Sequence, residues 1–107
     1  MTTLMTVEQT AFQLILHAGN AKSSLMEAMQ AARLGKLDEA HLKIEEAKKE
    51  LNAAHHSQTL LIQNEARGEK VELNILLIHA QDHLMNALTM RDLVIEIIYL
   101  HEKLNKK

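Results

Sequence analysis

The sequence predicts an all-α protein built from three long helices in an up-down-up arrangement. The chain has 107 residues, no proline and only three glycines, so little in it interrupts helical structure. Hydrophobic residues make up 47% of the chain but aromatic residues only 2%, which leaves leucine, isoleucine, alanine and methionine to form the core. We therefore expect a single domain over residues 1–107, with its helices joined by short turns.

The first helix is expected to begin at Thr6 and to end before Gly35. Thr6 is a good N-cap residue, and Gln9 stands where a capping box needs a glutamine or glutamate. Gly35 follows the last helical residues, as a C-terminal glycine does. Gly19 lies inside this helix at a cost of about 1 kcal/mol relative to alanine. It either permits a close helix contact or leaves room for another group beside the helix.

The second and third helices follow the same signals. The second is expected to begin near Asp38, a candidate N-cap, and to run to Arg67, with Gly68 ending it. The third should begin between residues 69 and 74 and run to about residue 105. Cationic residues at its end would suit the negative pole of the helix dipole, and the sequence supplies Lys103, Lys106 and Lys107.

Composition and charge exclude several classes of function. The formal net charge is −2, which gives no basic footprint for nucleic acid. The chain has no cysteine, so it cannot use a disulfide or a thiol nucleophile. No apolar stretch reaches the roughly 18–20 residues of a membrane span, and the start of the chain does not resemble a signal peptide. These features predict a soluble cytoplasmic protein.

The third helix is apolar on more than one side, which a lone three-helix bundle does not require. One face carries Leu73, Leu77, Ala80, Leu84 and Leu88. A second face carries Leu76, His83, Ala87, Met90, Val94 and Ile97, and a third carries Ile75, Ile78, Asp82, Met85 and Thr89. This apolar excess predicts self-association of the chain, with third helices placed around a symmetry axis.

The segment His79-Ala80-Gln81-Asp82-His83 interrupts this apolar run with polar side chains. At about 100° per residue, His79, Asp82 and His83 fall on one face of the helix, and Gln81 falls away from them. An unpaired buried polar group costs roughly 1–3 kcal/mol. The cluster therefore needs hydrogen-bond partners, a metal ion or a chemical role.

Histidine suits several of these roles because its ordinary pKa lies near neutrality. A neutral imidazole nitrogen can attack a phosphoryl group and later release it, provided that a neighbour orients the ring. His83 is one turn from His79 and is the candidate neighbour. His55 and His56 on the second helix could approach from across the bundle, with packing and function equally supported. The remaining three are expected at the surface or its boundary: His17, His41 and His101.

The sequence resembles the IIA components of the lactose/cellobiose class of the bacterial sugar phosphotransferase system. The resemblance is carried by four segments in order: Ala18–Ser23 (AGNAKS), Ala54–Thr59 (AHHSQT), Ile78–Met85 (IHAQDHLM) and Leu100–Leu104 (LHEKL). Together they span nearly the whole chain. Residues Leu76–Ala80 and the carboxy-terminal segment Leu100–Leu104 resemble the cellobiose or chitobiose branch of the class most.

The resemblance implies a phosphocarrier with a phosphohistidine intermediate. The phosphoryl group would pass from phospho-HPr to His79, then to the cognate IIB component, and so to a β-linked disaccharide entering through the IIC membrane permease. His83 would assist the transfer. Asp82 corresponds to a carboxylate at the three-fold axis of a homotrimeric helical bundle, where three copies would bind one Mg²⁺.

Two other classes of function remain open from the residues alone. His79, Asp82 and His83 could form a two-histidine, one-carboxylate metal site of a hydrolase or an oxygenase. That coordination set is awkward, because Asp82 and His83 are adjacent on one helix. The chain could instead be a structural helical adaptor whose polar cluster specifies the register of an oligomer.

Overall fold

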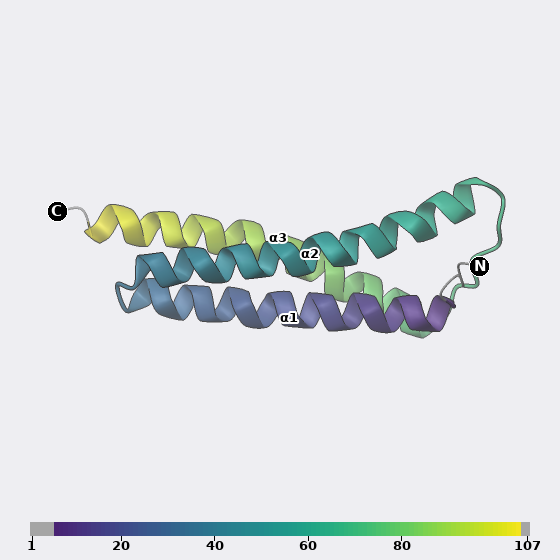
Figure 1. Cartoon of the computed structure of the whole chain (residues 1–107), viewed down its shortest axis with the longest axis horizontal. Helices are drawn as coiled ribbons and strands as arrows, with labels where there is room; N and C mark the ends of the chain where they lie inside the picture. The colour runs from purple at the N-terminus through teal and green to yellow at the C-terminus, as the bar shows by residue number, and fades with distance from the viewer. Residues whose placement is uncertain (1–5, 106–107) are drawn as a thin grey trace.

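The computed structural model describes residues 6–105, and these form three helices: α1 (Val7–Arg33), α2 (Leu37–Ala66) and α3 (Ile75–Asn105). The molecule is elongated, with principal dimensions of 57 × 25 × 20 Å. Helices α1 and α2 run antiparallel side by side, and the 67–74 connection returns the chain to the amino-terminal end of α1, from which α3 runs back (Figure 1). The predicted all-α, up-down-up protomer is confirmed.

The beginning and end of α1 follow the sequence signals. The Gln9 amide donates to Thr6 Oγ1 at 3.1 Å, and the Thr6 amide donates to Gln9 Oε1 at 2.9 Å, which completes the capping box. Gly35 has a φ of 79°, and its amide donates to the Ala32 carbonyl while the next amide donates to the Ala31 carbonyl. This left-handed glycine closes a Schellman motif. Gly68, with a φ of 87°, ends α2 in the same way.

The prediction that Asp38 caps α2 is wrong. Lys36 is the N-cap residue and makes no side-chain capping hydrogen bond. Because the Schellman motif already turns the chain at Gly35, helical hydrogen bonding resumes at once, with the Ala40 amide donating to the Lys36 carbonyl at 3.0 Å. Asp38 therefore lies within the first turn, where its charge favours the positive end of the helix dipole.

Helix α3 begins at Ile75, at the end of the interval expected from the sequence. Asn74 Oδ1 accepts a hydrogen bond from the Leu77 amide at 2.8 Å, so Asn74 supplies the cap. At the other end, Lys103 lies in the last turn as predicted, with its Nζ 5.3 Å from the centre of the Tyr99 ring. Lys106 and Lys107 lie outside the described residues.

Alanine dominates the core. It recurs at intervals of seven residues along each helix: Ala11 and Ala18, Ala21 and Ala28, Ala40, Ala47 and Ala54, and Ala80 and Ala87. Leu14, Leu25, Leu51 and Leu84 fill the spaces between them. A methyl group takes up little room, so the helix backbones can approach closely. Helix α1 packs along both α2 and α3, which places it at the centre of the bundle.

Helix α3 buries one face and leaves another open. Leu77, Ala80 and Leu84 are buried, whereas Ile78 and Met85 are exposed. Part of the apolar surface of α3 is therefore not covered by the rest of the protomer. The sequence pattern predicted this apolar excess. The second half of α2 is also uncovered, since no residue of that helix after Ala54 is buried, and in Figure 1 this half curves away from α1. None of the helices in residues 6–105 is long and apolar enough to cross a membrane.

The cap at Asn74 gives a test of the start of α3. We predict that Asn74→Ala lowers the free energy of unfolding by about 1 kcal/mol, because the Leu77 amide loses its acceptor. Asn74→Asp keeps an acceptor oxygen and should stay close to the wild type. Urea denaturation at one fixed protein concentration measures both. Equal stability of Asn74→Ala and wild type would show that the side chain does not cap the helix.

Candidate functional site

The two histidines singled out in the sequence meet on α3. Their Nε2 atoms lie 3.0 Å apart, and the rings stand nearly perpendicular, with an interplanar angle of 81°. His79 is exposed, whereas His83 is half-buried against the bundle. One turn of helix thus places two chemically identical side chains in different surroundings, in direct contact with each other.

Lys22 of α1 reaches the same site. Its Nζ lies 3.0 Å from His83 Nδ1, a contact between residues 61 positions apart in the chain. Lys22 is half-buried and follows the fully buried Ala21 on the packed face of α1. The motif containing Lys22 was recognised in the sequence, but its part in the site was not. The sequence feature that could have pointed to Lys22 is its position beside the alanines of the buried face of α1.

The surroundings of His83 favour its neutral form. Burial lowers the pKa of His83, and the positive charge of Lys22 and the neighbouring His79 lower it further, against a smaller opposing effect of Asp82. A lowered pKa means that protonation requires a more acidic solution than it does for a free histidine. His83 is therefore an uncharged imidazole at neutral pH, able to donate through one ring nitrogen and to accept through the other.

Asp82 does not join the histidine pair in a metal site of one protomer. Its side chain is exposed on the same open face of α3 as Ile78 and Met85. It takes part in no ion pair within the residues that the structure describes. Across residues 6–105 there is also no group of three histidine or carboxylate side chains placed to hold a metal ion. The hydrolase or oxygenase interpretation therefore has no coordination set in the protomer.

Gln81 points away from the histidine pair, as its position on the helix predicted. Its Oε1 accepts from Gln58 Nε2 of α2 at 2.7 Å, which ties α2 to α3 beside the site. His55 and His56 of α2 are both exposed, and no hydrogen bond in the described part of the chain joins either of them to His79 or His83. The protomer thus brings His79, His83 and Lys22 together, but not the α2 histidines.

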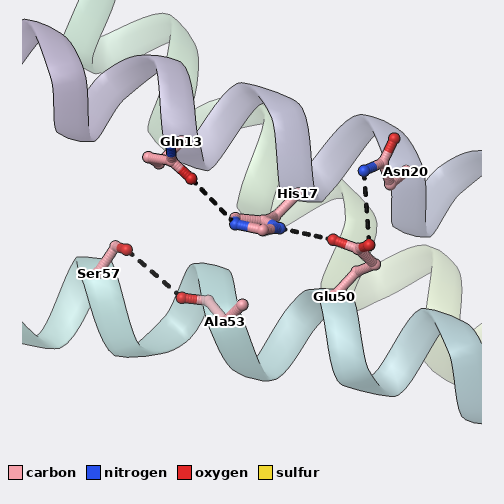
Figure 2. A network of polar contacts seen from close by, with 6 residues as sticks. All are labelled: Gln13, His17, Asn20, Glu50, Ala53 and Ser57. Atoms are coloured by element: carbon pink, nitrogen blue, oxygen red, sulfur yellow. Dashed lines mark hydrogen bonds and ion pairs between the residues drawn. The ribbon is translucent and has the colours of Figure 1, made fainter.

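A second polar cluster lies between α1 and α2 (Figure 2). His17 Nδ1 contacts Glu50 Oε2 at 2.5 Å, and His17 Nε2 contacts Gln13 Oε1 at 3.1 Å. Asn20 Nδ2 donates to the other Glu50 oxygen at 3.5 Å. His17 is half-buried, as expected for a boundary residue. Each ring nitrogen of His17 contacts an acceptor oxygen, so neither nitrogen is free to react. The role of this cluster is to join α1 to α2.

Two further expectations concern exposed positions. His41 is exposed and pairs with Glu102, which links α2 to α3 far along the chain from His79. Gly19 is exposed, and a Cβ added there would meet no atom within 4 Å. A close helix contact within the protomer therefore does not explain this glycine.

The cluster in Figure 2 gives a test of its structural role. We predict that Glu50→Gln lowers the free energy of unfolding by about 1 kcal/mol, because a half-buried charged hydrogen bond is replaced by a neutral one. Glu45→Gln is the matched control on the same helix, since within residues 6–105 Glu45 pairs only with Lys48, at 3.4 Å on the surface. Thermal unfolding compares the two variants. A larger loss in the control would contradict this assignment.

The contact between His79 and His83 is suited to nucleophilic group transfer. A neutral imidazole offers one lone pair, and an exposed ring lets a second macromolecule bring the group to it. His83 has protein neighbours at both ring nitrogens, Lys22 and His79. His79 is therefore the more accessible of the two rings, and His83 is the one held by neighbours on both sides.

Comparison with known proteins identifies the kind of transfer. Residues 9–102 match the family "PTS system, Lactose/Cellobiose specific IIA subunit". The lichenan-specific phosphotransferase enzyme IIA component of Bacillus subtilis is 55% identical over 101 residues, which cover 94% of this chain and 92% of the relative. The crystal structure of the PTS cellobiose-specific enzyme IIA from Bacillus anthracis superposes with a TM-score of 0.93, at 56% identity, covering 98% of this chain and 96% of that one.

A third comparison adds a structure with a partner. The IIA protein of the N,N'-diacetylchitobiose branch of the Escherichia coli phosphotransferase system was solved as a complex with HPr. It superposes with a TM-score of 0.82 at 35% identity, covering 95% of this chain and 99% of that chain. Sequence and structure agree over nearly the full length, so the chain belongs to the lactose/cellobiose-specific IIA family and is a phosphocarrier component of a sugar phosphotransferase system.

Proposed function

We propose that His79 is the residue that carries the phosphoryl group. The observation that supports this most directly is the difference in exposure within the histidine pair: His79 is exposed, whereas His83 is half-buried with Lys22 and His79 at its two nitrogens. The lone pair of a neutral His79 nitrogen attacks phosphorus, and the bond between phosphorus and the leaving atom of the donor breaks. His83 assists as a neighbour that orients the ring of His79.

The donor in this proposal is phospho-HPr, and the acceptor is the cognate IIB component. The chitobiose relative from Escherichia coli forms a complex with HPr, which supports HPr as the partner of this chain. Both partners must reach the same histidine in turn, so their binding surfaces should overlap around His79. The protein is linked to the membrane only indirectly, through the IIB component and the IIC permease. Its cytoplasmic location stays a prediction.

The sugar is proposed as a β-linked disaccharide of the cellobiose type. The lichenan-specific and cellobiose-specific relatives are 55% and 56% identical to this chain. The lactose-specific relative from Staphylococcus epidermidis is 40% identical and the chitobiose-specific relative from Escherichia coli 38%. Among the other relatives a galactose-specific component from Lactococcus lactis is 45% identical and a cellobiose-specific one 42%, so the proposal rests on the two relatives that exceed 50% identity.

We further propose that the protein works as a homotrimer with α3 at the three-fold axis. The open face of α3 carries Ile75, Ile78 and Met85, which are 85%, 54% and 53% exposed. Large apolar side chains gathered on one helix face mark a surface that another molecule covers. Three copies of this face would bury these side chains against one another and bring three Asp82 carboxylates together.

The chemistry of Asp82 fits a shared Mg²⁺ ion. A carboxylate is the kind of hard oxygen ligand that Mg²⁺ prefers, and Asp82 has no cation partner within the described residues to neutralise it. Three carboxylates close to an axis repel one another strongly unless a cation or protons reduce the charge. When bound, the ion would offset two of the three negative charges at the axis, and it has no part in the transfer step at His79.

The role of His79 is tested by removing its ring. His79→Ala should abolish uptake of labelled phosphate from phospho-HPr and keep the helix content of the wild type, because the exposed ring does not belong to the core. His83→Ala should still accept phosphate, but more slowly. The product on the wild type should be acid-labile and base-stable, as a phosphoramidate is. Labelled phosphate on His79→Ala would refute the assignment.

The role of Asp82 is tested by sedimentation with and without a chelator. The wild type should be a trimer that Mg²⁺ stabilises at neutral pH. Asp82→Leu should stay trimeric after chelation and keep His79 phosphorylation, because an apolar side chain fills the axis without charge repulsion. Asp92→Leu on the same helix is the control and should keep the dependence on Mg²⁺. A monomeric wild type in Mg²⁺, or an Asp82→Leu protein that dissociates, contradicts the axial site.

A further inference from the structure

Lys22 is the one group from outside α3 that contacts the histidine pair by a hydrogen bond within the described residues. Its side chain is half-buried, it comes from α1, and its Nζ lies 3.0 Å from His83 Nδ1. On the other side of the same ring, His83 Nε2 lies 3.0 Å from His79 Nε2. Three side chains from two helices thus form a continuous row of polar contacts that ends at the exposed ring.

The direction of hydrogen bonding along this row follows from the lysine. An ammonium group has three donors and no acceptor, so His83 Nδ1 must accept. A neutral imidazole that accepts at Nδ1 carries its proton at Nε2. That N–H points to His79 Nε2, which therefore accepts the hydrogen bond with its lone pair and carries no proton. The proton of His79 is then on Nδ1.

The histidine pair by itself would have no such preference. Two neutral rings that meet through their Nε2 atoms can share the hydrogen bond in either direction, with similar energy. In one direction His79 Nε2 is unprotonated and can attack once the hydrogen bond opens. In the other direction His79 Nε2 carries the proton, and the only lone pair of the ring is on Nδ1, the nitrogen nearer the helix backbone. The Lys22 ammonium group, which donates to His83 Nδ1, excludes the arrangement in which His79 donates to His83.

We propose that Lys22 is a positioning residue for phosphoryl transfer, whose ammonium group holds the proton on His83 Nε2 and so keeps His79 Nε2 unprotonated. The inference rests on the proposed role of His79. In the transfer step the hydrogen bond from His83 Nε2–H to His79 Nε2 breaks, and the freed lone pair of His79 Nε2 forms the new bond to phosphorus. The donor's bond to phosphorus breaks with its electron pair leaving on the donor. No proton has to move, because that of His79 is already on Nδ1. The His83 N–H, released from His79, becomes available to a phosphoryl oxygen.

The experiment compares Lys22→Met, Lys22→Arg and the wild type, each as the full chain labelled with ¹⁵N. Long-range ¹H–¹⁵N correlation spectra report which nitrogen of each imidazole carries the proton. In the wild type, His83 should be protonated at Nε2 and His79 at Nδ1. In Lys22→Met the shifts of both rings should move toward a mixture of the two tautomers. Lys22→Arg keeps a donor and should retain the wild-type pattern.

The rate of phosphoryl acceptance is measured on the same samples in single-turnover reactions with phospho-HPr. Loss of a partner that orients a metal-bound histidine lowers affinity or activity about 10- to 100-fold, and we take the lower end of this range for His83. We therefore expect a drop of about tenfold in Lys22→Met and substantial recovery in Lys22→Arg. Lys48→Met is the control for the loss of one positive charge, because Lys48 pairs with Glu45 on the surface of α2. Its rate and tautomers should match the wild type.

The two readouts separate the possible results. Unchanged tautomers in Lys22→Met overturn the proposal, and so does a changed tautomer pattern with an unchanged rate. A rate in Lys48→Met as low as that in Lys22→Met assigns the effect to net charge and also overturns it. His79→Ala in the same assay tests the phosphorylated residue separately, since the tautomer measurement on Lys22 variants needs no phosphate.

Discussion

Close packing of alanine between the helices is the constraint on which the rest of the structure depends. Alanines at seven-residue intervals occupy the buried positions of all three helices, and Ala21 and Ala80 have no exposed surface. Because these side chains are small, the helix axes can approach closely, and a lysine on α1 can reach a histidine on α3. A larger residue at either position would force the helices apart or strain the core. The site depends on this spacing as much as on its own side chains.

The parts of the fold that the sequence predicts well depend on short-range interactions. The capping box joins Thr6 and Gln9, which are three positions apart, and a positive φ requires the glycines that follow α1 and α2 locally. Asp38 shows where such a signal misleads. It has the side chain of a cap, but the Schellman motif at Gly35 starts α2 two residues earlier. The neighbouring motif, and not the propensity of one residue, decided the boundary.

The same distinction applies to the site. The 3.6-residue period of a helix is enough to place His79 beside His83, and the structure confirms that contact. Lys22 joins the site through a contact 61 residues away in the chain, and Glu50 meets His17 across 33 residues. Such pairs depend on how two helices pack, which one periodic pattern cannot specify. The exposed face around Asp82 was predicted as apolar excess, but a single protomer does not determine what covers it.

In the proposed mechanism the two histidines have different tasks because the bundle places them at different depths. His83 faces α1, where burial and the Lys22 charge lower its pKa and occupy its Nδ1. His79, one turn earlier, faces outward and can meet a partner protein. A carrier that both accepts and releases a phosphoryl group needs a nucleophile that is reachable and a supporting group that is held in place. An exposed pair would lack fixed orientation, and a buried pair would exclude the partners. A histidine pair at the edge of a helical bundle meets both requirements, because one ring is exposed and the other is half-buried.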